Sequence, residues 1–135
     1  MNANEFMRKK IQSILNLYKE MAIFEGYEVT GPESPGMDGD TPLHIAAMDG
    51  RLDLLAAMLP FVQHIDAPGD LGNTPLHYAV LKGHIEIANF FLDNRANIDC
   101  ENDYSETPFG LMLDRPGFEM IIQKYKVGHL NTGTR

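Results

Sequence analysis

The side chains of this 135-residue sequence with types suited to chemistry are five histidines, three of which the repeat pattern singles out, and one cysteine. His44, His77 and His84 are candidates for proton transfer, because the imidazole group ionises near neutral pH. Cys100 is the single cysteine, so it is a candidate thiol nucleophile or metal ligand, and an intrachain disulfide is excluded. The sequence has no Cys-x-x-Cys, no His-Glu-x-x-His and no phosphate-binding loop motif. We therefore predict a protein that is not an enzyme, with no catalytic residue, metal site or cofactor.

Two of these histidines belong to a tetrapeptide that the sequence repeats. The copies are Thr41-Pro42-Leu43-His44 and Thr74-Pro75-Leu76-His77, and Thr107-Pro108 begins a third, partial copy. Successive copies lie 33 residues apart, and the agreement between them continues well beyond the tetrapeptide. A fixed step of this length is the signature of an architecture built from stacked repeats.

Each repeat reads as two short helices. Thr74 can cap a helix with its hydroxyl group, and Pro75 suits the first helical position, where no N–H donor is needed. Gly83 ends this first helix. The second helix has its own apolar positions, at Ile85, Ala88, Phe91 and Leu92. Because two such helices cannot bury their apolar faces alone, neighbouring repeats must stack.

The repeated segments resemble the ankyrin repeat family. The resemblance is carried by Gly39-Asp40-Thr41-Pro42-Leu43-His44-Ile45-Ala46-Ala47 and Gly72-Asn73-Thr74-Pro75-Leu76-His77-Tyr78-Ala79. It implies an all-α solenoid of stacked helix-turn-helix units, with β-hairpin loops between the units. It also implies that the motif histidines bond to nearby backbone and to the threonine, so that they brace the stack. The structural motif positions are then Thr41, Pro42, Leu43, His44, Thr74, Pro75, Leu76, His77, Thr107 and Pro108.

The chain divides into a single row of units within one domain. We expect an N-terminal helical cap or degenerate repeat at 1–30, a turn-rich loop at 31–36, ankyrin repeats at 37–69 and 70–102, a C-terminal capping repeat at 103–127 and a frayed tail at 128–135. Residues 4–24 have helical spacing, and either one continuous helix or a broken pair fits them. The 31–36 loop lengthens the first connection by about three residues, either as a tolerated insertion or as a binding loop.

The charge of the sequence limits its partners. A net charge of −8 argues against general affinity for nucleic acid or for an anionic membrane. Arg8, Lys9 and Lys10 form a basic cluster that we assign to a solvated helix face, the alternative being a basic partner-binding patch. No apolar run approaches the ~20 residues of a membrane span, and basic residues interrupt any signal-type segment near the start. We expect a soluble, cytoplasmic monomer.

The predicted function is binding of a partner protein through the hairpin tips and the concave side of the first helices. The fifteen positions that match the family's contact sites hold seven acids and two bases, together with apolar anchors. Apolar anchors ringed by charge suit a protein interface, and the excess of acids predicts a partner that is basic at the contact. These positions are Met37, Asp38, Asp40, Met48, Asp49, Asp70, Leu71, Asn73, Leu81, Lys82, Asp103, Tyr104, Glu106, Asp114 and Arg115.

A more specific role is the alternative to a general adaptor. A small, acidic, single-domain protein can act as an inhibitor or immunity-type protein that neutralises a basic enzyme or toxin. Small size and acidity are the features that favour this hypothesis. An enzymatic function is the third hypothesis, and no constellation of residues in the sequence supports it.

Overall fold

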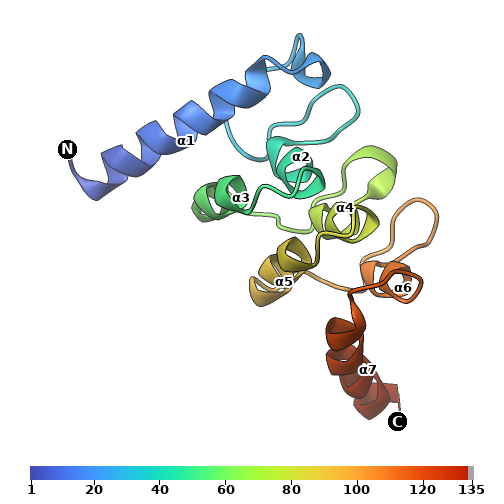
Figure 1. Ribbon diagram of the computed structural model, residues 1–135. Helices are drawn as coiled ribbons and strands as arrows, with labels where there is room; N and C mark the ends of the chain where they lie inside the picture. The colour runs from blue at the N-terminus through green and yellow to red at the C-terminus, as the bar shows by residue number, and fades with distance from the viewer. Residues whose placement is uncertain (134–135) are drawn as a thin grey trace.

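The computed structural model describes residues 1–133, which fold into α-helices joined by turns, with no β-strand (Figure 1). The helices are α1 (Ala3–Lys19), α2 (Pro42–Met48), α3 (Leu52–Met58), α4 (Pro75–Leu81), α5 (Ile85–Asp93), α6 (Pro108–Met112) and α7 (Glu119–Gly133). The helices α2, α4 and α6 stack side by side, and α3 and α5 form a second row beside them. This arrangement confirms the predicted all-α repeat fold.

The first helix of every repeat begins at the predicted threonine. The side chains of Thr41 and Thr74 each accept a hydrogen bond from the backbone N–H three residues later, and Nδ1 of the histidine there accepts the N–H of the threonine. Thr107 accepts from the N–H of Gly110 at 3.0 Å, but a glycine has no side chain to complete the reciprocal pair. Each proline follows its threonine at the first helical position, where the missing N–H costs nothing.

Glycines end α2 and α4. Gly50 and Gly83 have φ values of +70° and +73°, a left-handed conformation that a glycine adopts without a steric penalty. The residue after each glycine then donates its N–H back into the helix, from Arg51 to Ala46 at 3.0 Å and from His84 to Ala79 at 2.8 Å. These bonds satisfy the last carbonyl groups and turn the chain directly into the second helix.

The core is continuous along the stack because each repeat buries its apolar side chains against its neighbours. Alanines with no exposed surface line the α2–α4 contact and let the helices approach closely. Large apolar side chains fill this core. The largest of those that are fully buried are Phe24, Phe91, Phe118, Leu15, Leu43, Leu55, Met58, Leu76, Met112 and Val80.

The N-terminal segment is one continuous helix followed by a short turn, and so it is not a broken pair of helices. Asn2 caps α1 by accepting the Glu5 N–H at 2.8 Å, and the 3-10 turn Ala22–Phe24 follows the helix. Tyr18 packs edge-on against Phe24 with ring centroids 6.2 Å apart. With Ile11, Ile14 and Leu15, these rings cover the apolar flank of the first complete repeat.

The connection at 31–36 follows the register of the repeat. The Pro32 carbonyl accepts the Leu43 N–H at 3.1 Å, just as the Ile98 carbonyl accepts the Phe109 N–H at 3.1 Å. Pro32 and Ile98 therefore occupy equivalent positions, each eleven residues before its partner. From Pro32 onward the first connection therefore has the same length as the later ones.

Glu33 gives further evidence for that register. Its carboxylate oxygens accept the N–H groups of Gln63 at 3.1 Å and His64 at 2.6 Å, in the next repeat. Asp66, one step of 33 residues later, accepts the Asn97 N–H at 2.9 Å in the same way. The loop therefore ties two repeats together, which accounts for its acidic residue without a binding role.

The C-terminal end differs from the expected short cap and frayed tail. The last helix, α7, continues to Gly133, past the predicted boundary at 127. Phe118 and Ile121 are buried against the stack and anchor the start of this helix. The predicted tail beyond residue 133 lies outside the described residues. None of the helices in the described part of the chain is long and apolar enough to cross a membrane.

Candidate partner-binding face

Three tight turns connect the repeats, and their tips project along one side of the stack (Figure 1). Each turn is closed by a backbone bond from an N–H to the carbonyl four residues later: Gly36 to Asp40 at 2.8 Å, Gly69 to Asn73 at 2.8 Å and Asn102 to Glu106 at 2.9 Å. The predicted β-hairpins are thus reduced to turns within residues 1–133. A single backbone hydrogen bond closes each turn. The chain then enters the threonine cap of the next helix, which leaves no length for strand pairing.

The first turn is also bonded to the 3-10 turn Ala22–Phe24, and each later turn is bonded to the turn before it. The Met37 N–H donates to the Ile23 carbonyl at 2.8 Å, and the Asp103 N–H donates to the Leu71 carbonyl at 3.0 Å. Between them, the Asp70 N–H donates to the side chain of Asp40 at 2.9 Å. These bonds fix the spacing of the tips, so the side chains that the tips carry form a preorganised surface.

Asp40 was expected at the partner interface, and the structure corrects this. Its side chain is only 4% exposed. Its carboxylate accepts the Tyr78 hydroxyl at 2.9 Å in addition to the Asp70 N–H. Burial, followed by the bond to Asp40, raises the pKa of the Tyr78 phenol, so the hydroxyl remains a donor. Asp40 therefore joins two repeats instead of meeting a partner.

Asn73 requires the same correction. It is buried, and its side-chain oxygen accepts the amide of Asn102 at 2.9 Å, one turn further along. The sequence places both residues at the interface because their positions match the contact sites of the family that it resembles. Their burial depends on donors from the neighbouring repeat, and nothing local in the sequence indicates those donors.

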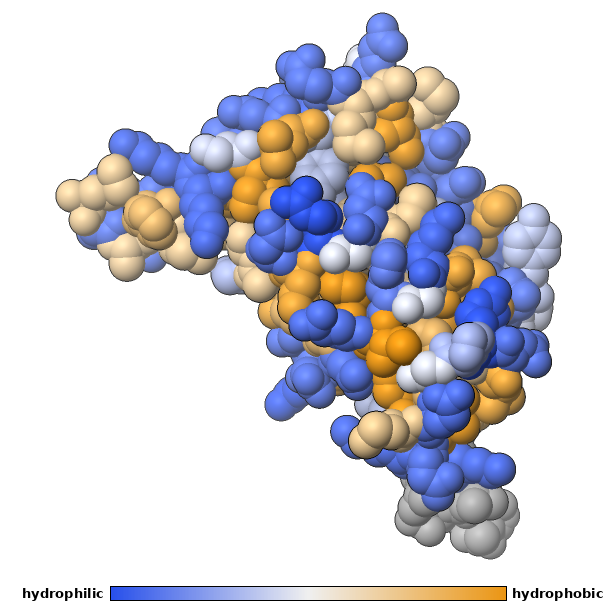
Figure 2. Space-filling view, in the orientation of Figure 1, coloured by the Kyte–Doolittle hydropathy of each residue, from blue (hydrophilic) through white to orange (hydrophobic). Residues whose placement is uncertain are grey.

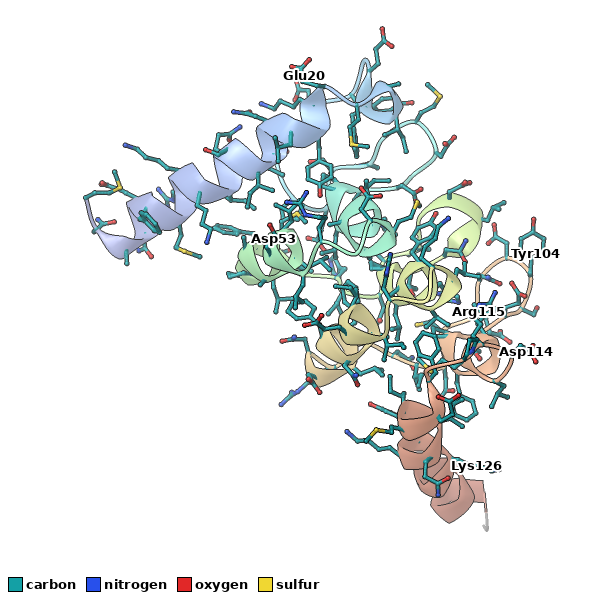
Figure 3. The ribbon with its side chains drawn as sticks, in the orientation of Figure 1. Glu20, Asp53, Tyr104, Asp114, Arg115 and Lys126 are labelled. Carbon is teal, nitrogen blue, oxygen red and sulfur yellow. The ribbon has the colours of Figure 1, made fainter. Side chains whose placement is uncertain are left out.

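The remaining tip residues share one pattern. Every tip presents one acidic residue next to one large apolar side chain: Met37 with Asp38, Asp70 with Leu71 and Asp103 with Tyr104. The apolar member of each pair is exposed, and Tyr104 is the most exposed of the three at 66%. Figure 3 shows Tyr104 at the outer edge of the molecule, on the loop that precedes α6.

A second row of predicted contacts lies where the first helices end. Asp49, Leu81, Lys82 and Asp114 are exposed, and Met48 is half-buried. Arg115 is also half-buried and donates to the Leu111 carbonyl at 2.8 Å, which holds it close to α6 (Figure 3).

Glu106 is the last of the predicted contact residues. It lies at the third turn, where its carboxylate accepts the Asn102 amide at 3.2 Å while the side chain stays exposed. With Asp40 and Asn73 removed, the accessible positions hold six acids and two bases, so the face remains strongly acidic.

The motif histidines are occupied on both ring nitrogens. His44 places Nε2 at 2.8 Å from the Ala67 carbonyl, which can only accept, so Nε2 carries the proton. Its Nδ1 lies 3.1 Å from the Thr41 N–H, which can only donate, so Nδ1 is unprotonated. His77 repeats this geometry with Thr74 and the Glu106 carbonyl. Both rings are neutral in one tautomer and have no free nitrogen for proton transfer.

His84 lies outside the motif, and its ring also forms a hydrogen bond to another repeat. Its Nε2 is 2.9 Å from the Met48 carbonyl, at the end of the first helix of the preceding repeat. This bond provides a partner for a carbonyl that the helix itself leaves unpaired. His84 thus connects α5 to α2, and we assign it a structural role.

A loss of stability in mild acid is expected from the two motif histidines. Burial lowers the pKa of both the His44 and the His77 imidazoles below the ordinary value of about 6.5. The unfolded chain then binds more protons than the folded one as the pH falls through about 6.5, so the free energy of unfolding must decrease there. Urea unfolding between pH 7.5 and pH 5.5 measures this slope. A stability that stays constant or rises as the pH falls would contradict the buried neutral state.

Cys100 has an environment unsuited to a nucleophile. The side chain is half-buried, and burial together with the charges of Asp66 and Asp99 raises the pKa of its thiol. The reactive thiolate form is therefore disfavoured. Within residues 1–133, the described His, Cys, Asp and Glu side chains form no group of three or more that could hold a metal ion.

Comparison with known proteins identifies the class to which this architecture belongs. A family model described as ankyrin repeats, in three copies, matches residues 10–102, which is more than half of the chain. The protein belongs to the ankyrin repeat family, whose members are generally protein–protein interaction modules and typically non-catalytic. A comparison with curated protein sequences found no match.

Proposed function

We propose that the protein binds a partner protein through the acidic tip face, defined as the three turn tips at 37–38, 70–71 and 103–104 together with the adjoining helix ends. The observation that carries this proposal is the repeated pairing of an acid with an exposed apolar side chain on tips held in register. Apolar side chains supply buried anchors at interfaces, and charges around them give specificity.

Charge supports a partner that is basic at the contact. Asp38, Asp70 and Asp103 repeat along the tips, and Asp49 and Asp114 extend the acidic character to the helix ends. Like charges in rows repel one another in the free protein, so they contribute nothing to the scaffold. A basic surface would relieve this repulsion, and the field would speed association at low ionic strength.

Charge reversal at two tips tests the electrostatic part of the proposal. In the variant Asp38→Lys with Asp103→Lys, partner binding should weaken by about tenfold or more, because each substitution replaces an attraction with a repulsion. The dependence of affinity on salt concentration should also become shallower. A partner captured from native lysate and then purified allows both quantities to be measured by titration calorimetry.

The matched control is Glu28→Lys with Asp93→Lys, which makes the same change in net charge at exposed positions outside the acidic tip face. Its affinity should remain within about twofold of the unmodified protein, since distant surface charges are screened. If both double variants bind the partner equally well, the contact surface lies elsewhere on the molecule.

The captured partner also decides between an adaptor and an inhibitor. A basic enzyme that loses its activity at one-to-one stoichiometry would make this protein an inhibitory module. A partner that keeps its activity, or that carries none, would make it a scaffold. The acidic tip face is the proposed contact in both cases.

A further inference from the structure

The helix α1 is longer than the helix α3 that it covers. It has 17 residues, whereas α3, against which it packs, has 7. The N-terminal turns of α1 consequently project beyond the repeats, as Figure 1 shows. The ankyrin repeat match begins at residue 10, so these projecting turns lie outside the matched segment.

The projecting part of α1 is apolar as well as basic. Phe6, in the N-terminal part of α1, is 59% exposed. Figure 2 shows apolar surface gathered at the free end of this helix. Met1, at the same end of the chain, is 76% exposed, and large apolar side chains gathered in this way are typical of an interaction site.

A groove runs between α1 and α3 on this side of the molecule. Its volume is about 710 Å³, and the residues along it are Met1, Phe6, Lys9, Lys10, Ser13, Ile14, Asp53 and Leu54. The lining residues that belong to α1 run from Phe6 to Ile14, a distance of roughly 12 Å at the helical rise per residue. This part of the groove therefore has the length of about two helical turns, with an apolar floor provided by Ile14 and Leu54.

The charge of the groove is opposite to that of the protein. The helix α1 carries Arg8, Lys9, Lys10 and Lys19 but only one acid, in a chain with a net charge of −8. The acid on the opposite wall, Asp53, forms an ion pair with Arg51 at 3.0 Å, so its charge is compensated locally. Lys9 and Lys10 therefore give the rim of the groove a positive charge.

We propose that the groove between α1 and α3 binds an acidic amphipathic helix of a partner protein. Apolar side chains of that helix, spaced by three or four residues, would contact Phe6, Ile14 and Leu54. Its acidic residues would meet Lys9 and Lys10 on the rim. The groove lies on the opposite flank from the acidic tip face (Figure 1), so the protein can hold a basic and an acidic partner together.

A library of amphipathic peptides tests this proposal without knowledge of the natural partner. The peptides are about 18 residues long, a length at which isolated helices form, with leucine fixed at one helical face and each flanking position either glutamate or lysine. Selection on the full-length protein should enrich glutamate over lysine. Amide shifts in NMR spectra of the complex should change at Ser13, Ile14 and Leu54 and leave Leu71 and Tyr104 unchanged.

Variants then assign the interaction to the groove. Lys9→Glu with Lys10→Glu, and separately Phe6→Ala, should each reduce the affinity of the enriched peptide by about tenfold or more. Their side chains are exposed, so the fold should survive, which circular dichroism checks. The matched control is Lys19→Glu with Lys126→Glu, an equal change in net charge outside the groove, and it should keep the affinity within about twofold.

Three results would overturn the proposal. They are a library without glutamate enrichment, amide shifts confined to the tips, and an equal loss of affinity in the control variant. Vesicles of anionic lipid provide the remaining comparison. Binding to the vesicles that depends on Lys9 and Lys10, with no selection of acidic peptides, would assign this helix to a membrane surface instead.

Discussion

Leu76→Ala should lower the free energy of unfolding by about 2–5 kcal/mol, the largest loss that we expect from any single substitution considered for this protein. Leu76 is 1% exposed and belongs to α4, which packs against α2, α5 and α6. Truncation leaves a cavity between three helices that themselves hold the stack together, so the surroundings cannot collapse to fill it. Urea unfolding followed by circular dichroism measures the change.

The matched control is Leu81→Ala, five residues later in the same helix, where the leucine is 36% exposed. The same chemical change there should cost about 0.5 kcal/mol, the scale of substitutions at accessible sites. Equal losses at the two positions would mean that α4 is not buried between its neighbours, and the stacked architecture would be wrong.

His77→Ala should lower the free energy of unfolding by about 1–3 kcal/mol, because it leaves buried donors and acceptors without partners. The imidazole lies between the Thr74 cap and the Glu106 carbonyl, so it links the start of α4 to the next turn. Its removal disrupts both the capping box and the contact between repeats. Chemical denaturation measures the loss of stability.

Partner binding separates the structural role of His77 from a functional one. Below the unfolding transition, the folded His77→Ala molecules should bind the partner as the unmodified protein does. His64→Ala is the control, since His64 is exposed, and it should leave stability nearly unchanged. A His77→Ala protein with full stability but no binding would show that the imidazole acts at the interface itself.

The start and end of α2 and of α4 can be predicted from the sequence because local residues determine them. A threonine hydroxyl bonds to an N–H three residues away, and a glycine provides its own left-handed conformation, so neither needs a distant partner. The step of 33 residues then requires stacking. These signals identify Thr74, Pro75 and Gly83 correctly without any knowledge of the tertiary structure.

The features that escaped prediction all depend on contacts across repeats. Asp40 reads as a surface acid in a turn, yet Tyr78 and the backbone of Asp70 bury and satisfy it from the next repeat. The register of Pro32 is set by a bond to Leu43 and not by local composition. The same limit applies to the acidic tip face, where sequence spacing locates the tips but cannot separate Asp38, which is exposed, from Asp40, which is buried.

The projecting end of α1 escaped prediction for a related reason. Helical spacing locates a helix near the start of the chain. How much of that helix packs against the repeats depends on α3, which is far away in sequence. The overhang and its groove appear only when both helices are placed together. The sequence predicts a solvated face for the basic cluster at Arg8, Lys9 and Lys10, whereas the groove beside Lys9 and Lys10 favours the alternative, a partner-binding patch.

Site-specific photo-crosslinking tests the binding role of the acidic tip face most directly. A photoreactive phenylalanine derivative replaces Tyr104 in one variant and Glu20, at the end of α1, in a control variant, both positions being exposed (Figure 3). Irradiation in native lysate should attach one specific protein to the position of Tyr104, and a charge-reversed Asp38→Lys, Asp103→Lys background should abolish that product. A product formed at the position of Glu20 and absent at Tyr104 would contradict the acidic tip face as the binding surface.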